Sequence, residues 1–169
     1  MNNTIRLASP LQFYSIVDGK GIRMVLWCQG CKVHCLGCHN PETQTLTGGK
    51  DYEIGDIITQ MLNHKNHHQG ITLSGGDPFL QPEQCKVIAE AAHNLGLDVW
   101  AYCGLTYEQI IRCPDKLELL KKCDVLVDGP FIESKKDLSL AFRGSSNQRI
   151  IDVQKSLSKR RIVLYENGR

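Results

Sequence analysis

Residues 22–41 read IRMVLWCQGCKVHCLGCHNP, and this stretch decides the fold. Its first part, residues 22–27, is apolar and β-branched, which predicts a buried strand. The strand runs directly into four closely spaced cysteines, Cys28, Cys31, Cys35 and Cys38. In parallel sheets, ligands bind beyond the carboxyl ends of the strands. The stretch therefore predicts a sheet that carries a cysteine site at one edge.

Helix-like and strand-like segments alternate downstream of this stretch. Apolar spacing predicts helices over residues 54–62 and 82–95, and Thr106 with Gln109 predicts a capping box for a third helical region. Strands are expected at residues 71–73, 98–102, 124–128, 149–153 and 161–165, and a long polar loop at 131–148. This alternation predicts an α/β fold in one domain, residues 1–169, with a mainly parallel sheet and covering helices.

Several polar segments each follow a predicted strand. They are the cysteine stretch, the segment SGGD at residues 74–77, Cys103 with Gly104, and Asp128 with Gly129. Because the carboxyl ends of parallel strands lie at one edge of a sheet, we expect these segments to meet there.

Composition restricts the class of protein. The 169 residues are 41% hydrophobic and 22% charged, which is typical of a globular protein. The net charge of +2 gives no indication of nucleic-acid binding, and no apolar run reaches the roughly 18 residues that span a bilayer. The N-terminal residues lack the apolar core of a secretory signal. We therefore expect a cytoplasmic protein whose eight cysteines stay reduced, with Cys85 and Cys123 in the core.

The spacing Cys31-x3-Cys35-x2-Cys38 is typical of a metal-binding loop. Three thiolates on one loop can each bind a different iron of a cubane cluster, which leaves the fourth iron open to a small molecule. A structural zinc site that also uses Cys28 is the main alternative, and a redox dithiol is a third. The apolar run before Cys28 weighs against zinc, because it favours a side chain that faces the core.

The Gly-Gly-Asp segment has two interpretations. Gly75 and Gly76 allow the backbone to approach a ligand closely, and Asp77 offers a carboxylate to an ammonium group. Alternatively, Asp77 caps a helix that begins at Pro78.

At this point the sequence resembles a known family. Residues 31–41, CKVHCLGCHNP, resemble the signature of radical S-adenosylmethionine (SAM) enzymes. The triplet at residues 38–40 and the segment DGKGIR at 18–23 are similar to the glycyl-radical-enzyme activases, in which Lys20 is usually proline. The resemblance implies a partial (βα) barrel of the radical SAM type. It also implies a 4Fe–4S cluster held by Cys31, Cys35 and Cys38, with one open iron.

The same resemblance implies residues that hold SAM. Gly37, Cys38 and His39 surround the third cysteine of the signature. Residues 74–77 resemble the family's second SAM motif, which binds the methionine amino group. The contacts implied there come from Ser74, Gly75, Gly76 and Asp77.

Three later segments resemble one branch of the activases. Residues 99–104, 124–131 and 142–150 are similar to proteins that activate the anaerobic (class III) ribonucleotide reductase, although Cys103 stands where threonine is usual. The resemblance implies that SAM cleavage yields a 5′-deoxyadenosyl radical, which then generates a glycyl radical on the reductase. It further implies an electron donor such as a low-potential flavodoxin or ferredoxin. The alternative within the class is an activase of pyruvate formate-lyase or a related enzyme.

The roles of several polar residues stay open at this level. Asp128 either coordinates a cation, orients a partner or stabilises a turn, and Arg143 either binds a carboxylate or is an ordinary surface residue. The histidines at positions 64, 67 and 68 are not expected to bind metal. The basic side chains of Lys155, Lys159, Arg160 and Arg161 form either a solvated face or a docking face for the donor.

Overall fold

The apolar run before the cysteines forms a strand in the middle of the sheet. The computed structural model describes residues 2–166, and in it this strand is β3 (Arg23–Cys28). It lies between β1 (Thr4–Leu7) and β5 (Gly70–Gly75) and is buried along almost its whole length. Burial on both faces explains why its sequence is continuously apolar rather than alternating.

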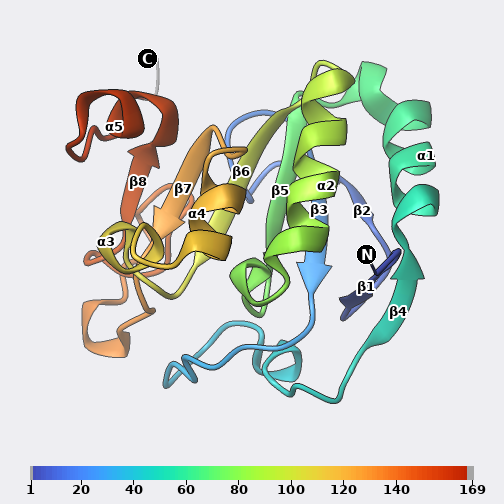
Figure 1. The fold of residues 1–169 in the computed structure, drawn as a ribbon. Helices are drawn as coiled ribbons and strands as arrows, with labels where there is room; N and C mark the ends of the chain where they lie inside the picture. The colour runs from blue at the N-terminus through green and yellow to red at the C-terminus, as the bar shows by residue number, and fades with distance from the viewer. Residues whose placement is uncertain (1, 167–169) are drawn as a thin grey trace.

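The sheet is mixed (Figure 1). It has eight strands in the order β4-β1-β3-β5-β6-β7-β8, and β2 pairs with β3 off this path. Strands β3, β5, β6 and β7 are parallel, whereas the pairs that involve β1, β2, β4 or β8 are antiparallel. The remaining bounds are β2 (Gln12–Ser15), β4 (Lys50–Glu53), β6 (Asp98–Cys103), β7 (Val125–Asp128) and β8 (Arg149–Asp152).

The prediction of a mainly parallel sheet is therefore wrong for the sheet as a whole. It holds only for the four central strands. Parallel neighbours require a crossover connection, and helices supply it between β5, β6 and β7. Strand β8 follows a loop that contains only a short 3₁₀ turn, so the chain returns in the opposite direction. Residues 161–165 form no strand, and Leu164 makes only an isolated bridge with Ile151.

The predicted helices are present. They are α1 (Ile54–His64), α2 (Pro82–Asn94), α3 (Tyr107–Ile110) and α4 (Pro114–Leu120), and α5 (Val153–Lys159) was not expected. The capping box is confirmed, with the Thr106 side chain accepting from the Gln109 backbone. Short 3₁₀ turns are η1 (Pro41–Thr43), η2 (Lys65–His67), η3 (Pro78–Leu80) and η4 (Glu133–Lys135). No helix within residues 2–166 is long and apolar enough to cross a bilayer.

Apolar side chains fill the space on both faces of the sheet. The larger core cluster includes residues of α1, α2 and α4, and it contains Cys28, Cys85 and Cys123. The expected core positions of Cys85 and Cys123 are thus confirmed. A smaller cluster centres on Trp100, against which Phe142 packs at a ring distance of 5.4 Å.

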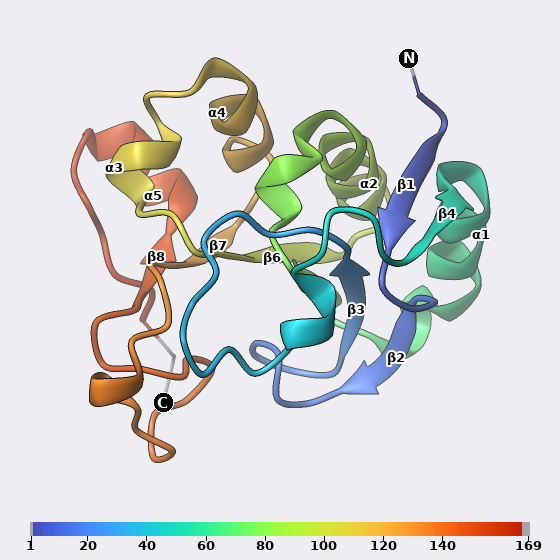
Figure 2. The same cartoon turned by 90° about the horizontal axis from the view of Figure 1, so that it is seen from below.

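Two long loops lie at the end of the sheet where the parallel strands terminate (Figure 2). The first is the cysteine loop, defined here as residues 29–43, which follows β3. The second is the late loop, residues 129–148, which joins β7 to β8. Both loops therefore meet at the edge where the sequence predicts the site.

Candidate functional site

A cavity of about 580 Å³ opens at the carboxyl ends of the parallel strands. Its walls come from four parts of the chain: the β2–β3 connection, the cysteine loop, the strand ends and the late loop. The lining includes Cys35, Cys38, His39, Ser74, Tyr102, Phe142, Arg143 and Gly144. A cavity of this size is large enough for a small-molecule cofactor.

Backbone hydrogen bonds close the base of the cysteine loop. The Gly30 N–H donates to the Thr43 carbonyl at 2.7 Å, and the Cys31 N–H donates to the Gln44 carbonyl at 3.1 Å. Between these points the chain folds into a compact loop, in which His34 adopts a left-handed φ of 53°. The thiols are therefore presented by a loop whose two ends are fixed.

Three of the four clustered cysteines are partly exposed in this loop. Cys31, Cys35 and Cys38 are half-buried free thiols, and the last two line the cavity. Burial raises the pKa of Cys35 above its ordinary value, and the charges of Cys31 and Cys38 raise it further. A backbone hydrogen bond from Phe131 opposes this increase. Negative charge on Cys31 and Cys38 thus disfavours the thiolate of Cys35, and a positively charged metal group would favour it.

Cys28 is separated from these three thiols. It is the last residue of β3, it is fully buried, and its Sγ lies 3.8 Å from the Sγ of Cys85 in the core. The expected core-facing side chain is confirmed. A zinc site would need Cys28 to join the other three around one ion, and its packing against Cys85 opposes that arrangement.

The donor set of the loop fits an iron–sulfur cluster. Thiolates are the usual ligands of such clusters, and three of them leave one iron of a cubane without a protein ligand. Within residues 2–166, no three His, Cys, Asp or Glu side chains surround one common position for a metal ion. Cys31, Cys35 and Cys38 would each hold a separate iron, and Ser74 and His39 line the space beside them.

The Gly-Gly turn packs directly against the cysteine loop. The Gly76 N–H donates to the Cys28 carbonyl and the Asp77 N–H to the Gly30 carbonyl, both at 2.8 Å. A Cβ at Gly75, whose φ is +106°, would collide with the backbone of Cys28. Only glycine allows this close approach, so the turn fixes where the cysteine loop leaves the sheet.

The Asp77 side chain caps the turn that follows it. Its Oδ1 accepts from the Phe79 N–H at 2.9 Å and from the Cys103 thiol at 3.4 Å. The side chain is 2% exposed and burial raises its pKa, while the cavity lining at this motif comes from Ser74. The capping interpretation is confirmed for the 3₁₀ turn η3, whereas contact of Asp77 with SAM stays a prediction.

The residues around the third cysteine contact the late loop. The His39 ring lies 4.9 Å from the Phe131 ring, and a Cβ at Gly144 would meet both rings at 3.0–3.1 Å. A Cβ at Gly37 would lie 3.2 Å from the Glu133 carboxyl carbon. The predicted SAM-binding residues Gly37 and His39 therefore lie at the junction of the two loops.

Several residues of the cavity were not expected from the sequence. Ile16, Val17 and Asp18 line it from the β2–β3 connection, and Tyr102 lines it from the end of β6. Ile16 and Val17 are large apolar residues that stay exposed, at 70% and 71%, and only the structure shows that they line the cavity.

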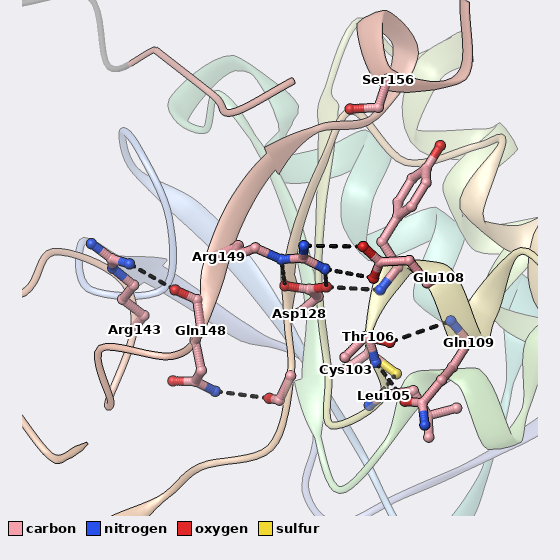
Figure 3. Close-up of polar contacts among 12 residues, drawn as sticks. Cys103, Leu105, Thr106, Glu108, Gln109, Asp128, Arg143, Gln148, Arg149 and Ser156 are labelled. Carbon is pink, nitrogen blue, oxygen red and sulfur yellow. Dashed lines mark hydrogen bonds and ion pairs between the residues drawn. The ribbon is translucent and has the colours of Figure 1, made fainter. Parts of the chain in front are cut away.

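Asp128 takes part in an ion-pair network (Figure 3). Its side chain is 1% exposed and accepts from Arg149 at 2.6 and 3.1 Å and from the Tyr107 N–H at 2.7 Å. Arg149 also pairs with Glu108 through two hydrogen bonds. Both carboxylate oxygens of Asp128 are thus engaged by protein donors, which supports the turn-stabilising alternative over cation binding.

The histidine group has a structural role in the described residues. His64 stacks on Phe13 at 4.1 Å, and its backbone carbonyl bonds to the ring of His68. The other ring nitrogen of His68 accepts from the Tyr14 N–H at 3.0 Å. Both ring nitrogens of His68 are therefore engaged by the protein.

Comparisons with known proteins agree in family. A family described as "4Fe-4S single cluster domain" matches residues 17–151. The anaerobic ribonucleoside-triphosphate reductase-activating protein of Salmonella typhi is 36% identical over 147 residues, which cover 81% of this chain and 94% of that protein. The protein of the same name from Escherichia coli K12 is 34% identical with the same coverage. The one from Enterobacteria phage T4 is 34% identical over 79% of this chain and 86% of that protein.

A solved structure shares the fold. The crystal structure of QueE from Escherichia coli superposes with a TM-score of 0.52 and covers 61% of this chain and 53% of that protein. The sequence identity is 13%, so this likeness concerns the fold alone.

Proposed function

Because this chain belongs to the family of anaerobic ribonucleoside-triphosphate reductase-activating proteins, we propose that it is the radical SAM enzyme that activates such a reductase. The observation that carries the proposal is the cysteine loop, in which three free thiols stand beside a 580 Å³ cavity while the fourth cysteine packs in the core. When bound, the cluster supplies the electron that cleaves SAM to methionine and a 5′-deoxyadenosyl radical, which takes a hydrogen from a glycine of the reductase.

The cluster ligands in this proposal are Cys31, Cys35 and Cys38. Their spacing on one loop gives each thiolate its own iron and leaves one iron for SAM. The hydrogen bonds at the base of the loop hold its two ends together, which reduces the entropy lost when the cluster binds.

We propose that SAM occupies the cavity between the cysteine loop, the ends of the parallel strands and the late loop. Cys38 and His39 would contact it from one side and Ser74 from the other, since these three predicted residues line the cavity. The predicted Gly37, Gly75 and Gly76 do not line it; they would shape the site by their close packing against the late loop and the cysteine loop. Asp77 would act on this site through the turn that it caps. Direct contact of its carboxylate with the methionine ammonium group is the alternative. His39 also joins the two loops, since its ring lies 4.9 Å from that of Phe131.

We further propose that the parallel strands β3, β5, β6 and β7 form the reduced (βα) barrel that positions this site. All four strands run toward the cavity, and the cysteine loop follows the first of them. Residues 1–169 would act as one domain, of which Met1 and residues 167–169 lie outside the described part.

The proposed electron donor is an acidic, low-potential flavodoxin or ferredoxin. We expect it to dock beside the cysteine loop, where Lys32 and Lys135 are exposed. Lys135 belongs to η4, which follows Phe131, a neighbour of His39. Positive charge at this position would attract an acidic donor to the cluster.

A set of alanine variants tests the cluster assignment. After anaerobic reconstitution, the wild type and Cys28→Ala are expected to hold about four irons per chain, and Cys31→Ala, Cys35→Ala and Cys38→Ala markedly fewer. Cys28→Ala is the matched control because it removes a thiol from the same segment without touching the cavity. Iron and sulfide analysis gives the count. One tightly bound zinc that is lost in Cys28→Ala would overturn the proposal.

The reaction itself is tested with the partner. The reconstituted and reduced wild type is expected to cleave SAM and to generate a glycyl radical on an anaerobic ribonucleotide reductase, detected by electron paramagnetic resonance. Activation of pyruvate formate-lyase in place of the reductase would favour the other activase class.

A further inference from the structure

Gln148 joins the two ends of the late loop through its side-chain amide (Figure 3). Its Nε2 donates to the Gly129 carbonyl at 3.1 Å, where the loop leaves β7. Its Oε1 accepts from the Gly144 N–H at 2.9 Å and the Ser145 N–H at 3.2 Å. One amide therefore joins the first residue of the loop to residues near its end, 15 to 16 positions further along the chain.

The backbone of Gln148 holds a further residue of the loop. Its carbonyl accepts from Nη1 of Arg143 at 2.6 Å, a contact that Figure 3 also shows. Arg143, Gly144 and Gln148 all line the cavity. The contacts of this one residue thus determine the position of a continuous section of the cavity wall.

This wall is in direct contact with the cysteine loop. Gly144 packs against His39 and Phe131, and any outward movement of Gly144 would open a gap between the two loops. His39 follows Cys38, one of the proposed cluster ligands. The position of the wall is therefore linked to the position of the proposed SAM contacts through van der Waals contact alone.

The wall also contains a strained residue. Phe142 has a φ of 62°, a left-handed conformation that is unfavourable for a residue with a Cβ. The Tyr102 hydroxyl donates to its carbonyl at 2.6 Å, and burial raises the pKa of Tyr102, so this donor stays protonated. Such a conformation persists only when neighbouring contacts hold it. Gln148 provides contacts to the two residues that follow Phe142, because it accepts hydrogen bonds from Arg143 and from the Gly144 N–H.

We infer that Gln148 is a positioning residue that fixes the late loop as the cavity wall and thereby sets the affinity for SAM. The inference rests on the proposed function, because it assigns SAM to this cavity. Gln148 acts through Gly144 and Arg143, since both polar atoms of its amide are already engaged by the protein. Its role depends on the ability of one side chain to donate and to accept at the same time.

Gln148→Glu is the most selective test of this role. It keeps the shape and the acceptor oxygen, but it replaces the donor to the Gly129 carbonyl with a second acceptor. Gln154 offers a matched control, because its Nε2 donates to the carbonyls of Lys121 and Cys123 at 3.0 and 2.8 Å. Gln154→Glu therefore makes the same chemical change at a glutamine that does not line the cavity.

The experiment compares the two variants after anaerobic cluster reconstitution. We expect Gln148→Glu to bind SAM about fivefold to tenfold more weakly, the range expected when one or two hydrogen bonds are lost, and to show a smaller SAM-induced change in the cluster spectrum. Gln154→Glu should match the wild type in both measurements. A second variant, Gln148→Asn, shortens the side chain but keeps the amide, and it should change SAM binding in the same direction.

Hydrogen exchange provides a readout that needs neither cluster nor activity. Backbone amides of residues 142–146 should exchange faster in Gln148→Glu than in the wild type or Gln154→Glu. Equal SAM affinity and equal exchange in both glutamate variants would overturn the inference, as would equal weakening in both. Should the wild type hold no cluster, the proposed function fails, and the exchange measurement still decides whether Gln148 closes the loop.

Discussion

At the scale of single residues, Asp77 illustrates how one side chain can serve fold and site together. Its carboxylate caps η3, while its backbone N–H holds the Gly30 carbonyl at the start of the cysteine loop. Burial raises the pKa of the carboxyl, so the charged form is less favourable in the folded state. The cap itself needs only an acceptor oxygen, and an amide offers one.

Substitution of Asp77 separates the effect of its acceptor oxygen on stability from the effect of its charge. Asp77→Ala leaves the buried Phe79 N–H without an acceptor and should lower the free energy of unfolding by about 1–3 kcal/mol. Asp77→Asn keeps an acceptor and should be as stable as the wild type or more stable. Because the folded-state pKa is raised, any advantage of Asp77→Asn should be largest at neutral pH, decline once the pH falls below the folded-state pKa, and vanish below the pKa of the unfolded chain.

Anaerobic denaturant unfolding of the cluster-free protein measures both variants, and SAM binding to the reconstituted variants gives the second readout. Strong loss of SAM affinity in a stable Asp77→Asn protein would indicate that the carboxylate itself contacts SAM. Unchanged affinity would indicate that Asp77 acts only through its turn.

At the scale of secondary-structure elements, Arg149 joins the ends of three of them. It begins β8, its guanidinium pairs with Asp128 at the end of β7, and it pairs with Glu108 in α3. The hydrogen bonds that Arg149 donates to Asp128 and Glu108 raise the pKa of Arg149 beyond its already high ordinary value, and the same pairing lowers the pKa of Glu108. This network fixes the start of β8, which directly follows Gln148, so it also stabilises the point where the late loop ends.

Loss of Arg149 should be costly because Asp128 would remain buried without its partner. We expect Arg149→Met to lower the free energy of unfolding by about 3–5 kcal/mol. The double variant Arg149→Met with Asp128→Asn should recover part of this loss, since the amide carries no charge and can still accept from the Tyr107 N–H. Thermal or denaturant unfolding provides the test. Equal stability of the single and the double variant would show that the buried charge is not the cause.

At the scale of the whole molecule, function is concentrated at one end of the sheet. The cysteine loop and the late loop lie at the carboxyl ends of the parallel strands, and α5 lies at the opposite end (Figure 1). Asp152 pairs with Val125 at the start of β7, and Val153 donates to the Asp124 carbonyl. The basic side chains on and after α5 are therefore remote from the cysteine loop, which argues against them as the donor docking face.

Charge reversal at the two ends of the sheet tests this placement. We expect Lys159→Glu with Arg160→Glu to leave the rate of cluster reduction and its salt dependence unchanged. Lys32→Glu with Lys135→Glu should slow reduction by about tenfold at low salt and weaken the salt dependence. Stopped-flow reduction by flavodoxin at two ionic strengths gives both quantities. The reverse pattern would place the docking face on α5.

Much of the central fold was predictable because its signals are local. The apolar run of β3, the helical periodicity of α1 and α2, and the capping box at Thr106 all lie within short windows of sequence. Strands β1, β2 and β4 were missed, and for β2 and β4 the reason is that they are polar or exposed along much of their length, so no apolar run marks them. Their antiparallel pairing, which makes the sheet mixed, depends on partners elsewhere in the chain.

The sequence by itself determined the succession of strand, cysteine loop and Gly-Gly turn, because the chemistry of three thiols depends on their identity and local spacing. Only the tertiary structure decided that Cys28 packs against Cys85, that Asp77 points to Phe79 and Cys103, and that the late loop completes the cavity. The first and last of these depend on contacts between residues that are far apart in the chain. The local apolar run already predicted that Cys28 faces the core, but its partner Cys85 lies 57 positions away, and such pairing depends on how the whole chain packs.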